Sequence, residues 1–266
     1  MQDGSLIPRF GRARRDPSLA VLEGFHAVKH ALRFGAQFEL LLTRDPAQLA
    51  QLSAALAPEL GEQLAAMART VTPELFAQLA PMPPSTGVIA LAQRPSVEVA
   101  AVLGDAAPAP VVLLEDPRDL GNMGACVRVA AAADAAAVLT TGGHDPWHPD
   151  ALRGGAGLHF ALPVARLHGL GDLGGPGATA GSRRTLLALD PDGEPLDPAA
   201  LDPRAILAFG TERDGISDEL LALADARVSI PMRRGVSSLN LATSVAAVLF
   251  AWRLHPAAQA HPAHLA

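Results

Sequence analysis

The chain has 266 residues, of which 49% are hydrophobic and 18% are charged, with a formal net charge of −6 at pH 7. This length suffices for one large domain or two modest ones, and the acidic balance argues against a uniformly basic nucleic-acid-binding surface. The single cysteine excludes an internal disulfide framework and favours a cytoplasmic location, and no apolar run approaches the roughly 18–20 residues that cross a bilayer.

The charge is divided unevenly along the chain. Residues 1–95 carry nine Arg and Lys against eight Asp and Glu, whereas residues 96–266 carry twelve against nineteen. Any RNA contact must therefore come from local arginine clusters, and arginine suits bidentate contacts with phosphate. The arginines expected to contact RNA are Arg9, Arg12, Arg14, Arg15 and Arg233. No apolar segment follows the first four, so they are not expected to belong to a secretory signal. The alternative for them is a solvated N-terminal tail.

The first 95 residues predict a small α/β unit. Helical periodicity predicts helices over residues 19–34, 47–56 and 73–79. Short apolar runs predict strands over residues 38–43 and 87–92. We therefore expect an N-terminal domain over residues 1–95.

A second domain is expected to follow a linker. Residues 96–109 are rich in Pro, Ala and Gly and indicate a linker, residues 110–256 form the predicted domain, and residues 257–266 form a tail. Apolar runs typical of buried parallel strands alternate here with helical patterns, which predicts a mostly parallel sheet covered by helices in an α/β fold. The predicted strands lie near 111–115, 136–141, 185–189, 205–209 and 227–230, and the predicted helices near 123–134, 217–224 and 240–254.

Three of the predicted strands end abruptly in Gly, amide and charged residues. The segments are LEDPRDLGNMGACVRVA at 114–130, ILAFGTERDGIS at 206–217 and IPMRRGVSSLNLATSVAAVLF at 230–250. In open α/β sheets, ligands bind at the carboxyl ends of the strands, so the three endings predict one pocket. The third segment has more hydrogen-bonding side chains than capping of the next helix requires. These are Ser237, Ser238 and Asn240.

The order and spacing of these segments resemble the SpoU (TrmH-type) family of RNA 2′-O-ribose methyltransferases, of the SPOUT superfamily. Each of the three motifs of that family has a counterpart in the same order along this chain. The first, N-x-G-x-x-x-R, is matched by Asn122, Gly124 and Arg128; the second, G-x-E-x-x-G, by Gly210, Glu212 and Gly215; the third by Ile230–Met232, Gly235 and Ser238–Asn240.

The resemblance implies a fold, an activity and partners. It implies a C-terminal trefoil knot and, from LEGFHAVKHAL and STGVIALA, an N-terminal ribosomal-protein-like domain that binds the RNA substrate. It implies transfer of a methyl group from S-adenosyl-L-methionine to a ribose 2′-hydroxyl of ribosomal or transfer RNA. It also implies a homodimer that pairs through the last helix. The lack of a bilayer-length apolar run and of a complete set of metal ligands leads us to expect no membrane partner and no metal.

The resemblance also implies roles for particular residues. The expected catalytic residues are Arg128, Asn122, Glu212, Ser238 and Asn240, and the expected cofactor-binding residues are Gly210, Ile230, Met232, Leu239 and Asn240. A neutral arginine at pH 7 costs roughly 7 kcal/mol at about 1.36 kcal/mol per pKa unit. We therefore expect a charged Arg128 that holds an RNA phosphate and stabilises the developing alkoxide. The alternative for the polar residues is a turn or a helix cap.

Other readings of the sequence stay open. Gly155 stands where the family usually has a serine near the active site, which puts substrate contacts there in doubt. His144 and His148 lie in a proline-containing loop without a third ligand, so no metal is expected. A non-catalytic RNA- or ribosome-binding protein with the same fold is the main alternative. A dehydrogenase would need a G-x-G-x-x-G loop, which the sequence lacks.

Overall fold

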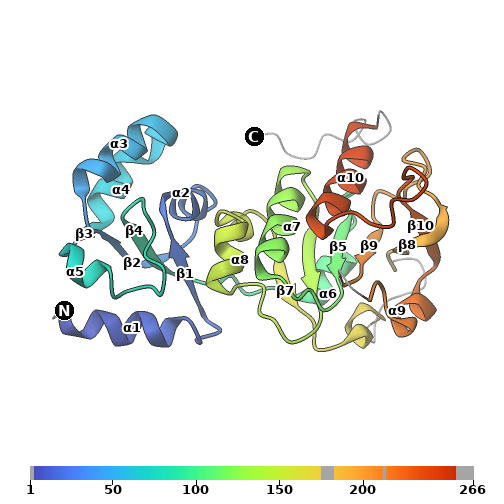
Figure 1. The fold of residues 1–266 in the computed structure, drawn as a ribbon, viewed down its shortest axis with the longest axis horizontal. Helices are drawn as coiled ribbons and strands as arrows, with labels where there is room; N and C mark the ends of the chain where they lie inside the picture. The colour runs from blue at the N-terminus through green and yellow to red at the C-terminus, as the bar shows by residue number, and fades with distance from the viewer. Residues whose placement is uncertain (1–2, 175–182, 212–213, 256–266) are drawn as a thin grey trace. The chain divides into compact units, whose positions relative to one another are not determined.

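The computed structural model describes residues 3–174, 183–211 and 214–255, and the chain divides into two compact units (Figure 1). The first unit contains residues 1–96 and 147–161, and the second contains residues 97–146 and 162–266. The predicted boundary did not include the return of residues 147–161 to the first unit. That segment packs there because helix α8 (Pro149–Gly154) lies against strand β1 (Leu19–Glu23).

The first unit is built on a four-stranded sheet with the order β1-β4-β2-β3. Strand β4 pairs antiparallel with β1 and β2, and β2 pairs parallel with β3. Its other elements are α1 (Leu6–Ala13), α2 (Phe25–Arg33), β2 (Phe38–Thr43), α3 (Pro46–Leu56), α4 (Gly61–Met67), β3 (Ala68–Thr70), α5 (Pro73–Phe76) and β4 (Val88–Gln93).

The single helix predicted over residues 19–34 is wrong, because this stretch forms β1 followed by α2. Gly24 separates the two elements with φ 98°, a left-handed conformation that favours glycine. The apolar residues before it pair with β4, where Val21 faces Leu91 across the ladder. Strand pairing within the buried sheet outweighs the helical periodicity of the local sequence.

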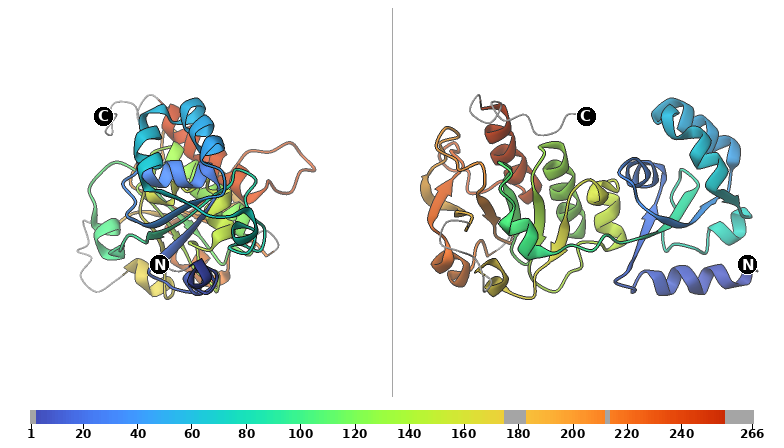
Figure 2. Two further views of the ribbon diagram at one scale, coloured as in Figure 1. Left: turned by 90° about the vertical axis from the view of Figure 1, so that its left-hand side faces the viewer. Right: turned by 180° about the vertical axis from the view of Figure 1, so that it is seen from behind.

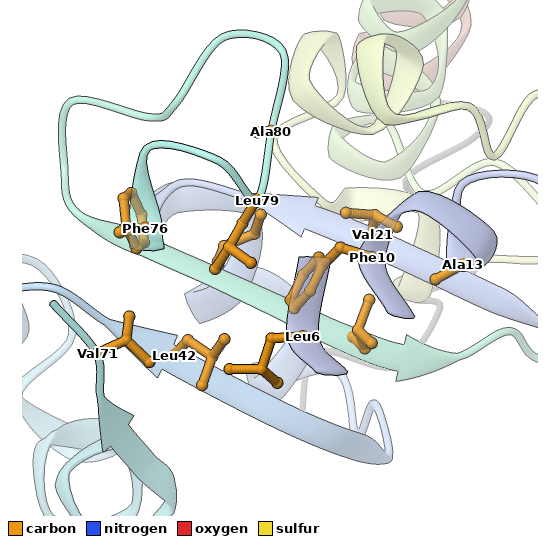
Figure 3. Close-up of a cluster of buried hydrophobic side chains, with 11 residues drawn as sticks. Leu6, Phe10, Ala13, Val21, Leu42, Val71, Phe76, Leu79 and Ala80 are labelled. Atoms are coloured by element: carbon orange, nitrogen blue, oxygen red, sulfur yellow. The ribbon is translucent and has the colours of Figure 1, made fainter. Parts of the chain in front are cut away.

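The N-terminal segment forms helix α1, so the alternative of a solvated tail is wrong. Leu6, Phe10 and Ala13 recur at helical spacing and are buried against the sheet. Figure 3 shows these side chains pointing toward Val21 and Leu79 on the same face of the sheet. The apolar side of this basic N-terminal helix is therefore part of the core of the first unit.

The second unit is built on a six-stranded parallel sheet with the order β10-β8-β9-β5-β6-β7. The predicted mostly parallel sheet is confirmed, with β7 as an additional edge strand. The elements are α6 (Val99–Gly104), β5 (Val111–Leu114), α7 (Leu120–Ala132), β6 (Ala137–Thr140), β7 (Val164–Arg166), η4 (Leu170–Gly174), β8 (Leu186–Pro195), β9 (Ile206–Phe209), α9 (Asp218–Leu223), β10 (Ala226–Ser229) and α10 (Leu241–Leu254).

Helices cover both faces of this sheet. Helices α7 and α10 lie side by side on one face, as Figures 1 and 2 show. On the other face, Val111 and Leu113 of β5 join a buried cluster that includes Leu220 of α9. Because alternate residues of a strand point to opposite faces, the continuous apolar runs of the central strands are buried on both sides.

The predicted linker contains helix α6 and belongs to the second unit. Arg184, which is 2% exposed, donates hydrogen bonds to the carbonyl oxygens of Leu103 at 3.2 Å and Ala109 at 2.8 Å, and to three others nearby. Burial lowers the pKa of the Arg184 guanidinium. These bonds hold the segment against the sheet. The Pro, Ala and Gly content of the segment did not indicate them. Within the described residues, no helix combines the length and the apolarity needed to span a membrane.

Candidate active site

A pocket opens in the second unit where the chain leaves strands β8, β9 and β10. The enclosed volume is about 140 Å³, and the empty space rises to about 710 Å³ when the open mouth is counted. We call it the strand-end pocket. Its described lining residues are Leu189, Asp190, Pro191, Phe209, Gly210, Thr211, Gly215, Ile230, Met232, Ser237, Ser238, Leu239, Leu241 and Ser244.

The turn after β9 forms one wall of the strand-end pocket. Thr211 and Gly215 exchange backbone hydrogen bonds of 2.9 and 3.2 Å, which close the turn into a narrow loop. A Cβ atom added at Gly210 would overlap the Gly215 backbone, so the loop closes only over a glycine. Gly215 has φ 69°, a conformation that also favours glycine. The two motif glycines therefore have a direct steric role.

A buried carboxylate ties this loop to the neighbouring strand. Glu115, at the end of β5, is 9% exposed and accepts hydrogen bonds from the Ser217 backbone N–H at 2.8 Å and from the Ser217 hydroxyl. Ser217 also caps helix α9 by accepting from Leu220 N–H at 3.2 Å. Hydrogen bonds to a charged group are stronger than neutral ones. Glu115 therefore positions the glycine loop, a role that the motif comparison missed.

A side-chain hydrogen bond joins the first and third motifs. Asn240 Nδ2 donates to Asn122 Oδ1 at 3.0 Å, although the two residues are 118 positions apart. Asn240 Oδ1 also accepts from the backbone N–H groups of Ala242 and Thr243, which caps helix α10. Capping and contact with the first motif thus coexist in one side chain. The packing of α7 against α10 brings the two asparagines together.

The predicted site residues have different places in the structure. Gly210, Ile230, Met232 and Leu239, predicted to hold the cofactor, line the strand-end pocket, as does Ser238, predicted to be catalytic. Asn240 lies between the pocket wall and Asn122. Arg128 is exposed on α7 and is not among the lining residues that the structure describes. Glu212 lies outside the described residues.

Sequence reasoning missed several residues of the pocket wall. Asp190 and Pro191 follow the first part of β8, and Ser244 lies in the first turn of α10. Asp190 could have been found, because it is a charged residue at the end of a predicted strand. Ser244 could not, since it follows Asn240 by four residues within an apolar helical pattern.

The arginines predicted to contact RNA are also placed differently. Arg9 forms an ion pair with Glu39 at 2.8 Å, and Arg14 forms one with the buried carboxylate of Glu23. The Arg14 side chain is only 18% exposed. The remaining members of the predicted set are exposed: Arg12, Arg15 and Arg233.

Comparisons with known proteins find relatives of this chain. The model of the SpoU rRNA Methylase family matches residues 109–250. The chain is 36% identical over 171 residues to an uncharacterized tRNA/rRNA methyltransferase of Mycobacterium bovis, which covers 62% of this chain and 58% of that protein. It is 32% identical over 145 residues to a 23S rRNA (uridine(2479)-2'-O)-methyltransferase of Streptomyces viridochromogenes, covering 52% and 50%. The chain thus spans about half the length of the curated relatives it matches.

A solved structure shares the fold over most of the chain. The crystal structure of the SpoU methyltransferase AviRb from Streptomyces viridochromogenes, in complex with the cofactor AdoMet, has a TM-score of 0.74. The sequences are 24% identical, and the match covers 92% of this chain and 97% of that chain.

Proposed function

Because this chain belongs to the SpoU rRNA methylase family, we propose that it transfers a methyl group from S-adenosyl-L-methionine to a ribose 2′-hydroxyl of RNA. The observation that carries the proposal is the hydrogen bond between Asn122 and Asn240, which joins two of the three family motifs beside the strand-end pocket. A relative named as a 23S rRNA 2′-O-methyltransferase supports the choice of the ribose oxygen.

The strand-end pocket suits a cofactor of this kind. Its walls combine apolar side chains such as Ile230 and Leu239 with hydroxyl groups such as Ser238 and Ser244. An adenine ring needs apolar faces, and a methionine moiety needs hydrogen-bonding partners for its charged ends. Gly210 and Gly215 approach each other closely and carry no side chains, so this part of the wall takes up little of the cavity. The bound cofactor would supply an activated methyl group, so the protein must mainly align the reactants and handle the hydroxyl proton.

We assign roles to the residues around the pocket accordingly. Asn122 and Asn240 orient the ribose and hold the first motif against the third. Arg128, exposed on α7, holds an RNA phosphate as a cation and stabilises the developing alkoxide. Ser238 binds the cofactor, and Glu212 keeps its proposed role in positioning the RNA.

We also propose the trefoil knot that the family resemblance implies. Helix α10 follows the edge strand β10, yet it packs beside α7, which follows β5 three positions further into the sheet. The chain between β10 and α10 must cross back over the strand-end pocket to reach that position, and residues of this segment line the pocket. A path threaded through the loop after β9 agrees with both observations.

We propose a homodimer that pairs through the exposed face of α10. Thr243, Ala247, Phe250 and Leu254 recur at helical spacing and are exposed, with Leu254 67% exposed. Exposed apolar side chains at such spacing favour burial against a partner. Light scattering at micromolar concentration should give the mass of a dimer, and replacement of Phe250 and Leu254 by Asp should give a monomer.

The proposed RNA is ribosomal RNA, with transfer RNA as the alternative, in the cytoplasm. The first unit is proposed as an RNA substrate-binding domain, with Arg12 and Arg15 exposed on or beside α1 and Arg233 exposed in the second unit. Mapping ribose methylation in cells with and without the protein would identify both the RNA and the nucleotide.

Methyl transfer to RNA transcripts with radiolabelled S-adenosylmethionine tests the proposed activity directly. Arg128→Ala should reduce turnover by about 10²-fold or more, the size of effect seen when one charge-stabilising donor is removed. Arg128→Lys should also be impaired, because an ammonium group cannot make the bidentate contact. Cofactor affinity should stay unchanged in both variants, since Arg128 is not among the described lining residues. A wild-type chain that binds RNA but not S-adenosylmethionine would favour the non-catalytic alternative.

A further inference from the structure

Asp190 differs in character from the other residues of the strand-end pocket. Among the lining residues that the structure describes, it is the one with an ionisable side chain. Its side chain is 15% exposed, so the carboxylate is largely withdrawn from water. An anionic group in such a wall interacts more strongly with charge in the cavity than a solvated group would.

An irregularity in the pairing of β8 with β10 positions the Asp190 carboxylate. Strand β8 pairs with β10 through Ala188 and again from Glu194, so the five residues between them leave the ladder. The excursion is held at its end by Gly193, where an added Cβ would lie 2.6 Å from the Arg227 carbonyl carbon. Ser229 Oγ also donates to Gly193 O at 2.9 Å. The excursion is therefore a fixed part of the wall.

Two groups contact Asp190 from the neighbouring backbone and strand. Oδ1 accepts from the Asp192 backbone N–H at 2.9 Å, which orients the carboxylate. Oδ2 lies 3.7 Å from Nη1 of Arg227 on β10, whose side chain is 51% exposed. An ion pair with a half-exposed arginine is weak, because water screens it. The carboxylate therefore keeps most of its attraction for a cation in the pocket.

We propose that Asp190 makes the strand-end pocket prefer the cationic cofactor to its neutral product. This inference rests on the proposed function, and it concerns how the same site distinguishes two ligands. S-adenosylmethionine carries a sulfonium charge that S-adenosylhomocysteine lacks, while the two share the adenine, ribose and amino-acid groups. A carboxylate in the wall stabilises the first ligand more than the second, which favours release of the product after each turnover.

Calorimetry with three ligands tests this role: S-adenosylmethionine, S-adenosylhomocysteine and sinefungin, in which an amine replaces the methylsulfonium. Asp190→Asn retains an oxygen that can accept from Asp192 N–H but removes the charge. We expect it to weaken S-adenosylmethionine and sinefungin by about three- to tenfold and to change S-adenosylhomocysteine less than twofold, as for a partly screened charge pair. Arg227→Gln should shift the preference in the opposite direction, because it removes the competing cation.

The controls separate this inference from the proposed function. Asp192→Asn removes the same charge from an exposed side chain outside the described lining and should leave all three affinities unchanged. Equal weakening of all three ligands by Asp190→Asn, as expected if the carboxylate binds the shared ribose, would overturn the inference. So would three unchanged affinities. A wild-type chain that binds none of the three ligands would instead overturn the proposed function.

Discussion

The ion-paired arginines of the first unit and the arginines in the motif segments of the second unit have different partners. In the first unit, Arg14 and Arg153 both contact the buried carboxylate of Glu23, and Arg9 pairs with Glu39. In the motif segments of the second unit, Arg128, Arg233 and Arg234 are exposed, and none forms an ion pair with a residue that the structure describes. Elsewhere in that unit, Arg183, Arg227 and Arg253 do form ion pairs. The difference teaches that an arginine-rich segment predicts RNA contact only where acidic side chains of the fold do not already occupy the guanidinium groups.

The largest effect is expected at the junction of the motifs in the second unit. Asn240→Asp retains an oxygen that caps α10, but it replaces the donor to Asn122 by a carboxylate that repels Asn122 Oδ1. Misplacement of reacting groups by about 1 Å can cost about 10²-fold in rate, so turnover should fall by at least that factor. Methyl-transfer kinetics on RNA and a thermal melt measure the two consequences separately.

A double-mutant cycle sharpens this prediction. Asn122→Ala removes the oxygen that accepts from Asn240 Nδ2 and should cause a loss of similar size. Combined with Asn240→Asp, it should lose much less than the product of the two single losses, because both substitutions act on one contact. Independent losses would mean that the two asparagines act separately. A fall in melting temperature as large as that of an unrelated core variant would mean that Asn240 mainly stabilises the fold.

The second largest effect is expected on the stability of the first unit. Glu23 is 2% exposed at its side chain, and Glu23→Gln removes the charge that both Arg14 and Arg153 contact. The cost should be about 2–3 kcal/mol, between the values for exposed and buried ion pairs. Trp147 lies in the first unit, so its fluorescence in a Trp252→Phe background reports the unfolding of that unit.

The matched control for Glu23 lies in the same unit. Glu39 is 31% exposed and pairs with Arg9, which is 26% exposed. Glu39→Gln should therefore cost less than about 1 kcal/mol. If the two substitutions had equal effects, burial of Glu23 would not explain the use of arginine in this unit.

The sequence predicted the central strands better than the contacts between residues distant in the chain. The strands at 111–115 and 205–209 were predicted well, because central parallel strands are apolar on both faces and read as continuous runs. The three strand endings predicted one pocket because geometry brings the carboxyl ends of parallel strands to one edge. The role of Arg14 was not predictable, because its partner Glu23 becomes buried only after β1 pairs with β4. Asp190 directly follows the strand predicted at 185–189, but the break in strand pairing that places it in the pocket wall has no local sequence signal.

A smaller effect is expected from the exposed arginines beside the third motif. Arg233→Ala combined with Arg234→Ala should weaken RNA binding by about tenfold near 50 mM salt and make the salt dependence shallower, since each phosphate contact contributes to the slope. Filter binding across a salt series measures both quantities. Stability should not change, because both side chains are exposed.

The corresponding substitutions in the first unit should behave in the opposite way. Arg9→Ala combined with Arg14→Ala should leave RNA affinity within about twofold and lower the stability of the first unit, since both arginines are in ion pairs. Loss of RNA binding without loss of stability would mean that these two arginines contact RNA, as the sequence predicts.

The smallest effect is expected from the pH dependence of the first unit. His30 Nδ1 lies 2.8 Å from the carbonyl oxygen of Ala156, and burial lowers the pKa of His30 more than this hydrogen bond raises it. The folded state therefore binds a proton less readily than the unfolded state. The stabilising contribution is present above the unfolded pKa of about 6.5 and is lost as the pH falls through the folded pKa.

Between pH 7.5 and 5.5, the unfolding midpoint reported by Trp147 should fall further for the wild type than for His30→Gln. His26 is exposed on the same helix, so His26→Gln should retain the wild-type slope. Equal slopes in all three proteins would show that titration of His30 does not contribute to the pH dependence of the first unit's stability.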